Sequence, residues 1–138
     1  FAPLLADTAR RWGAAAAFLS IEPQLESVRL PPEALGNGGI TWLITGGESG
    51  NGSRIRPYRP EWAAEIIEQA RAAGIAPFVK QFGNIAAKEM GLRGKGDDPA
   101  TWPAELAVQE FPLPRRVLVA TAPVKASRKG RTLPMALL

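Results

Sequence analysis

The sequence of 138 residues contains no cysteine and no histidine. These absences exclude zinc fingers, iron–sulfur ligation by this chain, thiol nucleophiles and any mechanism that uses an imidazole base. No apolar run approaches the roughly 18 residues that a membrane-spanning helix requires. The apolar run over residues 13–19 is also short and lacks the cleavage pattern of a signal peptide. We therefore expect a soluble, cytoplasmic protein without membrane contacts.

Acidic residues are absent from residues 114–138, where six of the 17 basic residues lie. The rest of the chain is close to neutral, and 46% of all residues are hydrophobic, which suits a folded core. We expect one folded domain over residues 1–112 and a basic, disordered tail over residues 113–138. The chain begins with Phe1 rather than methionine, so we expect a piece of a longer reading frame or a processed product.

The sequence does contain two kinds of apolar segment, one with helical spacing and one with continuous apolar residues. Apolar residues recur at helical spacing between Pro60 and Ala73, and continuous apolar runs indicate buried strands. The predicted elements are helices over residues 3–12, 60–73 and 102–108 and strands over residues 17–21, 40–45 and 76–81. Because strands and helices alternate, we expect a parallel sheet that is covered by helices on both faces.

Each predicted strand is followed by a polar motif. The three motifs are Ser20-Ile21-Glu22-Pro23, Gly46-Gly47-Glu48-Ser49-Gly50 and Lys80-Gln81-Phe82-Gly83. In parallel α/β folds the ligand site forms beyond the carboxyl ends of the strands. We therefore expect the three motifs to converge on one polar site.

The glycine-rich motif predicts cofactor binding by Gly46, Gly47, Glu48 and Ser49. Adjacent glycines let a ligand approach the backbone closely, and exposed amides bind an anionic group. Glu48 is then placed to bind the ammonium group of an amino-acid-like ligand. The alternative is a simple turn with a solvated glutamate. The motif is not a P-loop, because the required lysine–serine pair is missing.

Substrate binding is predicted for a second group of side chains, namely Glu22, Lys80, Gln81, Arg54 and Arg56. Lys80 suits a substrate carboxylate, or an ion pair with Glu22 or Glu48. Arg54 and Arg56 suit a phosphate or carboxylate clamp. Structural alternatives are a strand-ending carboxylate, an ion pair across the strand ends and a solvated loop. No residue is assigned as catalytic or as a metal ligand.

Four segments, taken in order, resemble one family. They cover residues 18–25, 42–50, 78–83 and 97–112. They resemble the phage gene-product-37/68 family, which consists of radical-S-adenosylmethionine-like proteins of unassigned activity. The resemblance covers residues 1–112 and leaves the basic tail outside.

The resemblance implies a partial (βα) barrel with parallel strands, roughly the C-terminal half of a TIM-like barrel. It also implies S-adenosylmethionine and a [4Fe–4S] cluster, which an N-terminal three-cysteine motif holds in the full-length family. This sequence departs from that pattern because it has no cysteine. The implied role is therefore the substrate-side portion of such a protein, inactive alone, with the strand-end residues facing cofactor or substrate.

Two other functions compete with this one. The first is a non-catalytic remnant or small binding module, whose basic tail contacts nucleic-acid phosphates. The second is a self-contained hydrolase that uses Glu22 and Glu48 as an acid–base pair. The expected partners are the missing N-terminal half or a second copy of the chain, together with a small-molecule or nucleotide-like substrate.

Overall fold

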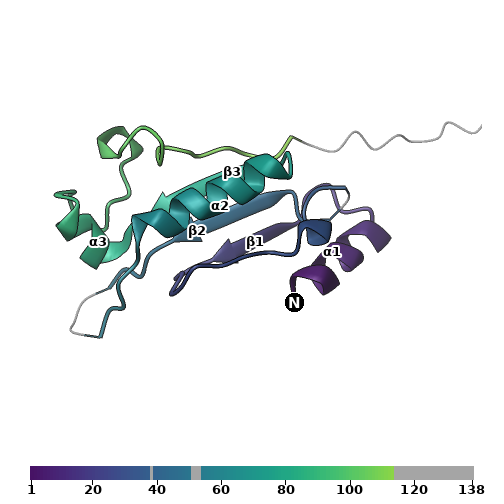
Figure 1. Ribbon diagram of the computed structural model, residues 1–138, viewed down its shortest axis with the longest axis horizontal. Helices are drawn as coiled ribbons and strands as arrows, with labels where there is room; N and C mark the ends of the chain where they lie inside the picture. Colours follow the sequence, from purple (N-terminus) through teal and green to yellow (C-terminus); the bar gives the residue numbers. More distant parts are fainter. Residues whose placement is uncertain (38, 51–53, 114–138) are drawn as a thin grey trace, which may run out of the picture.

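The computed structural model describes residues 1–37, 39–50 and 54–113, which form an elongated α/β domain (Figure 1). The tail predicted over residues 113–138 lies, beyond residue 113, outside the described residues. The elements in chain order are α1 (Ala2–Arg11), β1 (Phe18–Ile21), the 3-10 turn η1 (Pro32–Ala34), β2 (Trp42–Gly46), α2 (Pro60–Ala72), β3 (Ala76–Gln81), α3 (Gly83–Glu89) and the 3-10 turn η2 (Pro99–Thr101). No helix among the described residues is long and apolar enough to cross a membrane.

The three strands form one parallel sheet in the order β1-β2-β3. Phe18 of β1 pairs with Trp42 of β2, which pairs with Ala76 of β3. The predicted mixed α/β architecture and the parallel pairing of the three strands are thus confirmed. Because the strands are parallel, their carboxyl ends lie together at one end of the sheet. The three polar motifs follow the strands at this end.

Helix α2 forms where the sequence predicts it. Pro60 occupies its first turn, where a missing amide donor costs nothing. Its apolar stripe, Ala63, Ile66, Ile67 and Ala70, is buried. This stripe packs on β2 and β3, so the crossover between these parallel strands covers the sheet that it connects (Figure 1). Helix α1 also matches its prediction and ends before Gly13.

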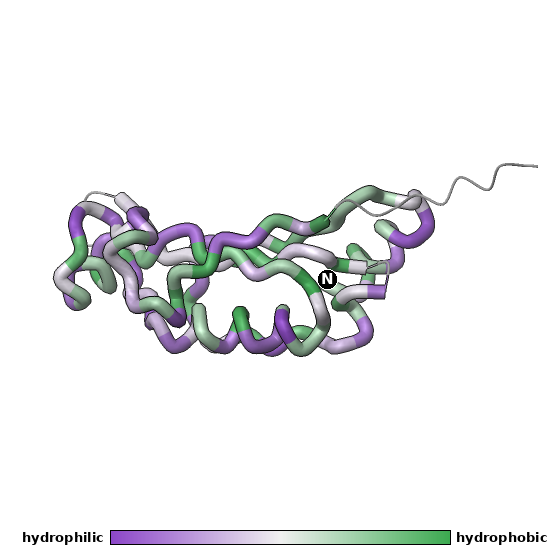
Figure 2. Tube along the Cα trace, turned by 90° about the horizontal axis from the view of Figure 1, so that it is seen from above, coloured by the Kyte–Doolittle hydropathy of each residue, from purple (hydrophilic) through white to green (hydrophobic). Residues whose placement is uncertain are grey.

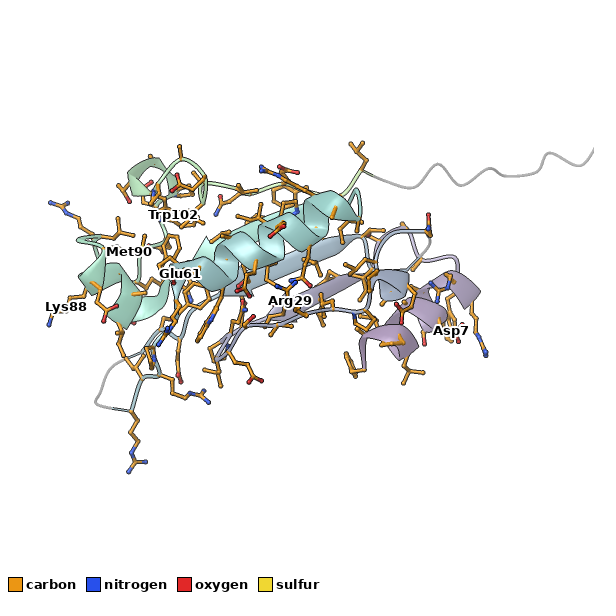
Figure 3. All side chains as sticks on the ribbon, viewed as in Figure 1. Asp7, Arg29, Glu61, Lys88, Met90 and Trp102 are labelled. Atoms are coloured by element: carbon orange, nitrogen blue, oxygen red, sulfur yellow. The ribbon has the colours of Figure 1, made fainter. Side chains whose placement is uncertain are left out.

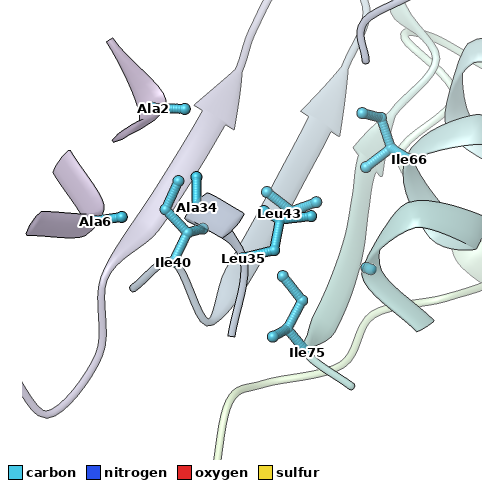
Figure 4. Packing of buried hydrophobic residues seen from close by; sticks show 9 residues of the cluster. Ala2, Ala6, Ala34, Leu35, Ile40, Leu43, Ile66 and Ile75 are labelled. Carbon is cyan, nitrogen blue, oxygen red and sulfur yellow. The ribbon is translucent and has the colours of Figure 1, made fainter. Parts of the chain in front are cut away.

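Both long helices lie on one face of the sheet, which corrects the expectation of helices on both faces. Ala2 and Ala6 of α1, Leu43 of β2 and Ile66 of α2 belong to a single buried cluster (Figure 4). Hydrophobic segments run through the middle of the elongated trace (Figure 2). Alternate strand residues on the opposite face are only half buried or exposed, including Phe18 at 55%.

Aromatic rings line this opposite face, called the open face below. Trp42 makes edge contacts with Phe18 and Phe78, with ring centroids 5.9 Å and 5.8 Å apart. Phe111 lies against Trp42 at 5.3 Å between centroids. No described helix covers the open face, which only the segment around Phe111 packs against. The aromatic rings on this face therefore stay partly exposed.

The predicted helix over residues 102–108 is wrong. This stretch forms turns and then pairs with the outer edge of β3, where the Val79 amide donates to the Val108 carbonyl at 2.8 Å. Backbone groups used in this pairing are not free for helical bonds. Trp102 instead packs on Phe82, with ring centroids 4.8 Å apart, in a second buried cluster. Helix α3, which the sequence analysis missed, follows β3 directly.

Candidate site at the carboxyl ends of the strands

An ion pair joins the two outer strands across the middle one. Lys80 on β3 donates to Glu22, which directly follows β1, with 2.9 Å between Nζ and Oε2. Gly46 ends β2 between them, and a Cβ on Gly46 would lie 3.1 Å from Glu22 Oε1. The missing side chain at Gly46 therefore leaves the space that the carboxylate occupies. Of the partners that the sequence left open for Lys80, the structure shows Glu22.

The two partners of this pair differ in exposure. The Lys80 side chain is 53% exposed, so its ammonium group is open to solvent. Glu22 is 21% exposed, and its Oε1 atom is buried without a hydrogen-bond partner among the described residues. A buried acceptor without a donor costs about 1–3 kcal/mol. This oxygen is therefore suited to accept a donor from a ligand, next to an ammonium group that is open to solvent.

Glu48 is held by a different cation. Its Oε2 accepts from the Arg56 Nε at 2.8 Å and from the Arg56 amide at 3.0 Å, and its Oε1 accepts from Nη2 at 3.3 Å. The side-chain and backbone hydrogen bonds from Arg56 hold the pKa of the Glu48 carboxyl below its ordinary value. Glu48 and Arg56 therefore pair with each other. Lys80 pairs with Glu22 and not with Glu48.

The remaining residues of the glycine-rich motif are fixed by packing. A Cβ on Gly47 would lie 2.1 Å from the Phe82 carbonyl oxygen, so glycine is required here for the close approach of two backbones. The Gln81 amide donates to the Gly47 carbonyl at 3.2 Å and to the Ser49 hydroxyl at 3.4 Å. These contacts give Gly47 a role in backbone packing and place Ser49 beside Gln81.

Arg54 does not join the site. Its side chain is exposed and makes no hydrogen bond or ion pair with the rest of the described chain. The structure thus brings Glu22, Lys80 and Gly46 together on one side of the strand ends and Gln81 with Ser49 on the other. Ligand binding by these residues stays a prediction.

A buried polar network beside the site was missed by the sequence analysis. The Thr45 hydroxyl lies 2.6 Å from Gln24 Oε1 and 2.9 Å from the Tyr58 hydroxyl. Gln24 and Thr45 are 1% and 0% exposed. Burial raises the pKa of the Tyr58 hydroxyl above its ordinary range. The network ties the segment after β1 to β2 and to the loop before α2, so it fixes the backbone on which Glu22 and Gly46 lie.

Comparison with known protein families places the chain. A family model described as "Protein of unknown function (DUF5131)" matches residues 5–135. The chain belongs to the DUF5131 family. No curated protein and no solved structure matches the chain significantly. The resemblance to radical-S-adenosylmethionine-like phage proteins therefore stays a prediction for this DUF5131 chain.

The residues of the DUF5131 chain do not fit an iron–sulfur cluster. The sequence has no cysteine and no histidine. The described residues also contain no cluster of three side chains with carboxylate, imidazole or thiolate ligands that could hold a metal ion. A cluster of this kind would have to be held outside this chain. Glu22 and Lys80 offer opposite charges for a small polar ligand instead.

Proposed function

We propose that this chain is the substrate-side portion of a radical-S-adenosylmethionine-like protein and is inactive alone. In this proposal the three-stranded sheet is part of a (βα) barrel, completed by strands that carry the cysteine motif. The ion pair of Glu22 and Lys80 at the carboxyl ends of parallel strands carries the proposal, because ligand sites of parallel α/β folds lie at that edge.

The charges of this pair favour a zwitterionic, amino-acid-like ligand. The ligand ammonium would replace Lys80 as the partner of Glu22, and its carboxylate would pair with Lys80. Both protein charges then stay compensated, which matters because an unpaired charge is costly away from water. The unpartnered Oε1 of Glu22 supplies an additional acceptor for the ammonium group. A ligand with a single charge would leave one member of the pair without a partner.

Reconstitution tests this proposal. The gene is first examined upstream of the Phe1 codon for an in-frame segment with three closely spaced cysteines. The chain is then co-expressed with that segment without oxygen, and iron–sulfur absorbance and S-adenosylmethionine cleavage are recorded with dithionite as reductant. We expect cleavage by the pair of segments and by neither one alone.

Two variants test the residues within that assay. Lys80→Met and Glu22→Gln each remove one charge of the pair, and we expect substrate binding to weaken at least tenfold, about 1.4 kcal/mol. Lys88→Met is the matched control, because Lys88 lies on α3 and points away from the domain (Figure 3). The absence of such an upstream segment, or a reconstituted pair without cluster and cleavage, would overturn the proposal and favour a non-catalytic binding module.

A further inference from the structure

The described sheet has one covered edge and one open edge. At β3 the Glu110 amide donates to the Pro77 carbonyl at 3.0 Å, and the Gln109 side chain donates to the Val79 carbonyl at 3.0 Å. At the opposite edge β1 has β2 as its only strand neighbour in the described part of the chain. Half of the β1 backbone groups therefore face outward, and an open strand edge is a template for pairing with another chain.

An apolar groove of about 630 Å³ runs along this open edge between α1 and β1. Leu5, Ala9 and Trp12 line it from the helix, and residues 16–20 line it from the strand. Phe1 and Trp12 are 89% and 84% exposed, although they are large and hydrophobic. In Figure 1, α1 lies beside β1 at the end of the molecule opposite α3, so no other described helix covers the groove.

The exposed aromatic rings of the groove supply part of the area that a stable interface needs. A buried aromatic side chain removes about 150–250 Å² from water, so the exposed parts of Phe1 and Trp12 offer roughly 350 Å² per copy. A standard interface takes about 800 Å² from each partner. The outward backbone of β1 and the aliphatic walls of the groove adjoin these rings and extend the same surface.

We propose that this surface, the β1 edge with the α1–β1 groove, binds a second copy of the chain. A two-fold axis across the edge pairs β1 with its symmetry mate in antiparallel orientation, so one patch serves both copies. Because the β3 edge is already covered by residues 108–110, the assembly closes at two copies and does not grow into a filament.

The dimer leaves the site accessible. Antiparallel pairing of β1 turns the carboxyl ends of the two sheets to opposite ends of the dimer, so each Glu22–Lys80 pair stays open to solvent. A strand supplied by another polypeptide would need the same β1 edge. The dimer is therefore measured on the 138-residue chain without any upstream segment.

Sedimentation velocity between about 1 μM and 1 mM, the range in which modest interfaces titrate, tests the proposal. We expect a reversible monomer–dimer equilibrium without larger species. Trp12→Lys should weaken the dimer at least tenfold, since it places a charge in the groove without removing a core residue. Leu113→Lys is the matched control, because Leu113 is a large apolar residue that is 89% exposed and lies outside the groove.

Hydrogen–deuterium exchange locates the interface independently of any substitution. The amides of residues 18–21 should gain protection as concentration rises, while those of β3 should not change. A chain that stays monomeric up to 1 mM would overturn the proposal, as would open-ended growth. A dimer that is insensitive to Trp12→Lys, or that protects strands other than β1, would equally overturn it.

Discussion

A buried polar side chain stabilises the fold only when it has hydrogen-bond partners, and Thr45 is the clearest example beside the site. Its hydroxyl contacts both Gln24 and Tyr58 in a region without solvent. Thr45→Val keeps the shape but leaves two buried polar groups without this partner, so we expect the free energy of unfolding to fall by about 1–3 kcal/mol. Urea denaturation measures the loss. Thr8→Val is the control, because the Thr8 hydroxyl bonds to Leu4 within an exposed helix turn; equal losses for both variants would contradict the assignment.

The sequence identified the residue types of the site better than their partners. The sequence placed Glu22 and Lys80 near each other, because parallel strands bring their carboxyl ends together, but it left Glu22, Glu48 and a substrate carboxylate as alternative partners of Lys80. The pairing of Glu48 with Arg56 could not be predicted, because it depends on the path of the loop between them. Thr45 and Tyr58 gave only a weak signal, a polar residue inside an apolar run and the single tyrosine of the chain. Side-chain networks depend on three-dimensional placement that spacing does not encode.

At the scale of elements, the junction between β2 and α3 depends on Gly47. Its backbone lies against the carbonyl of Phe82, so Gly47→Ala must push two chain segments apart. We expect a loss of about 1–3 kcal/mol in the free energy of unfolding, the usual cost of overpacking, measured by thermal or urea melts. Gly50→Ala is the control, since a Cβ at Gly50 meets no atom within 4 Å. If both variants were equally stable, the close approach would not be a constraint.

Element prediction succeeded where a repeating pattern determined the structure. The stripe of α2 and the apolar runs of the three strands placed these elements correctly. The segment over residues 102–108 was misassigned because pairing of Val108 and Glu110 with β3 outweighs local helical preference. The open face of the sheet could not be predicted either, because its half-buried residues, such as Trp42, are as hydrophobic as residues of a buried core. A hydrophobic run shows that a strand is apolar on both faces, not what covers each face.

At the scale of the whole molecule, an elongated domain with an apolar edge should be more stable when that edge is covered. If two copies bind each other through β1, the folded state is favoured by mass action, and the melting temperature rises with protein concentration. For a domain of this size we expect about 2–4 °C for each tenfold increase. Differential scanning calorimetry at several concentrations measures this slope. Trp12→Lys should flatten it and Leu113→Lys should leave it unchanged, because only Trp12 lines the groove. A flat profile for the unmodified chain would mean that the open edge of β1 contributes nothing to its stability.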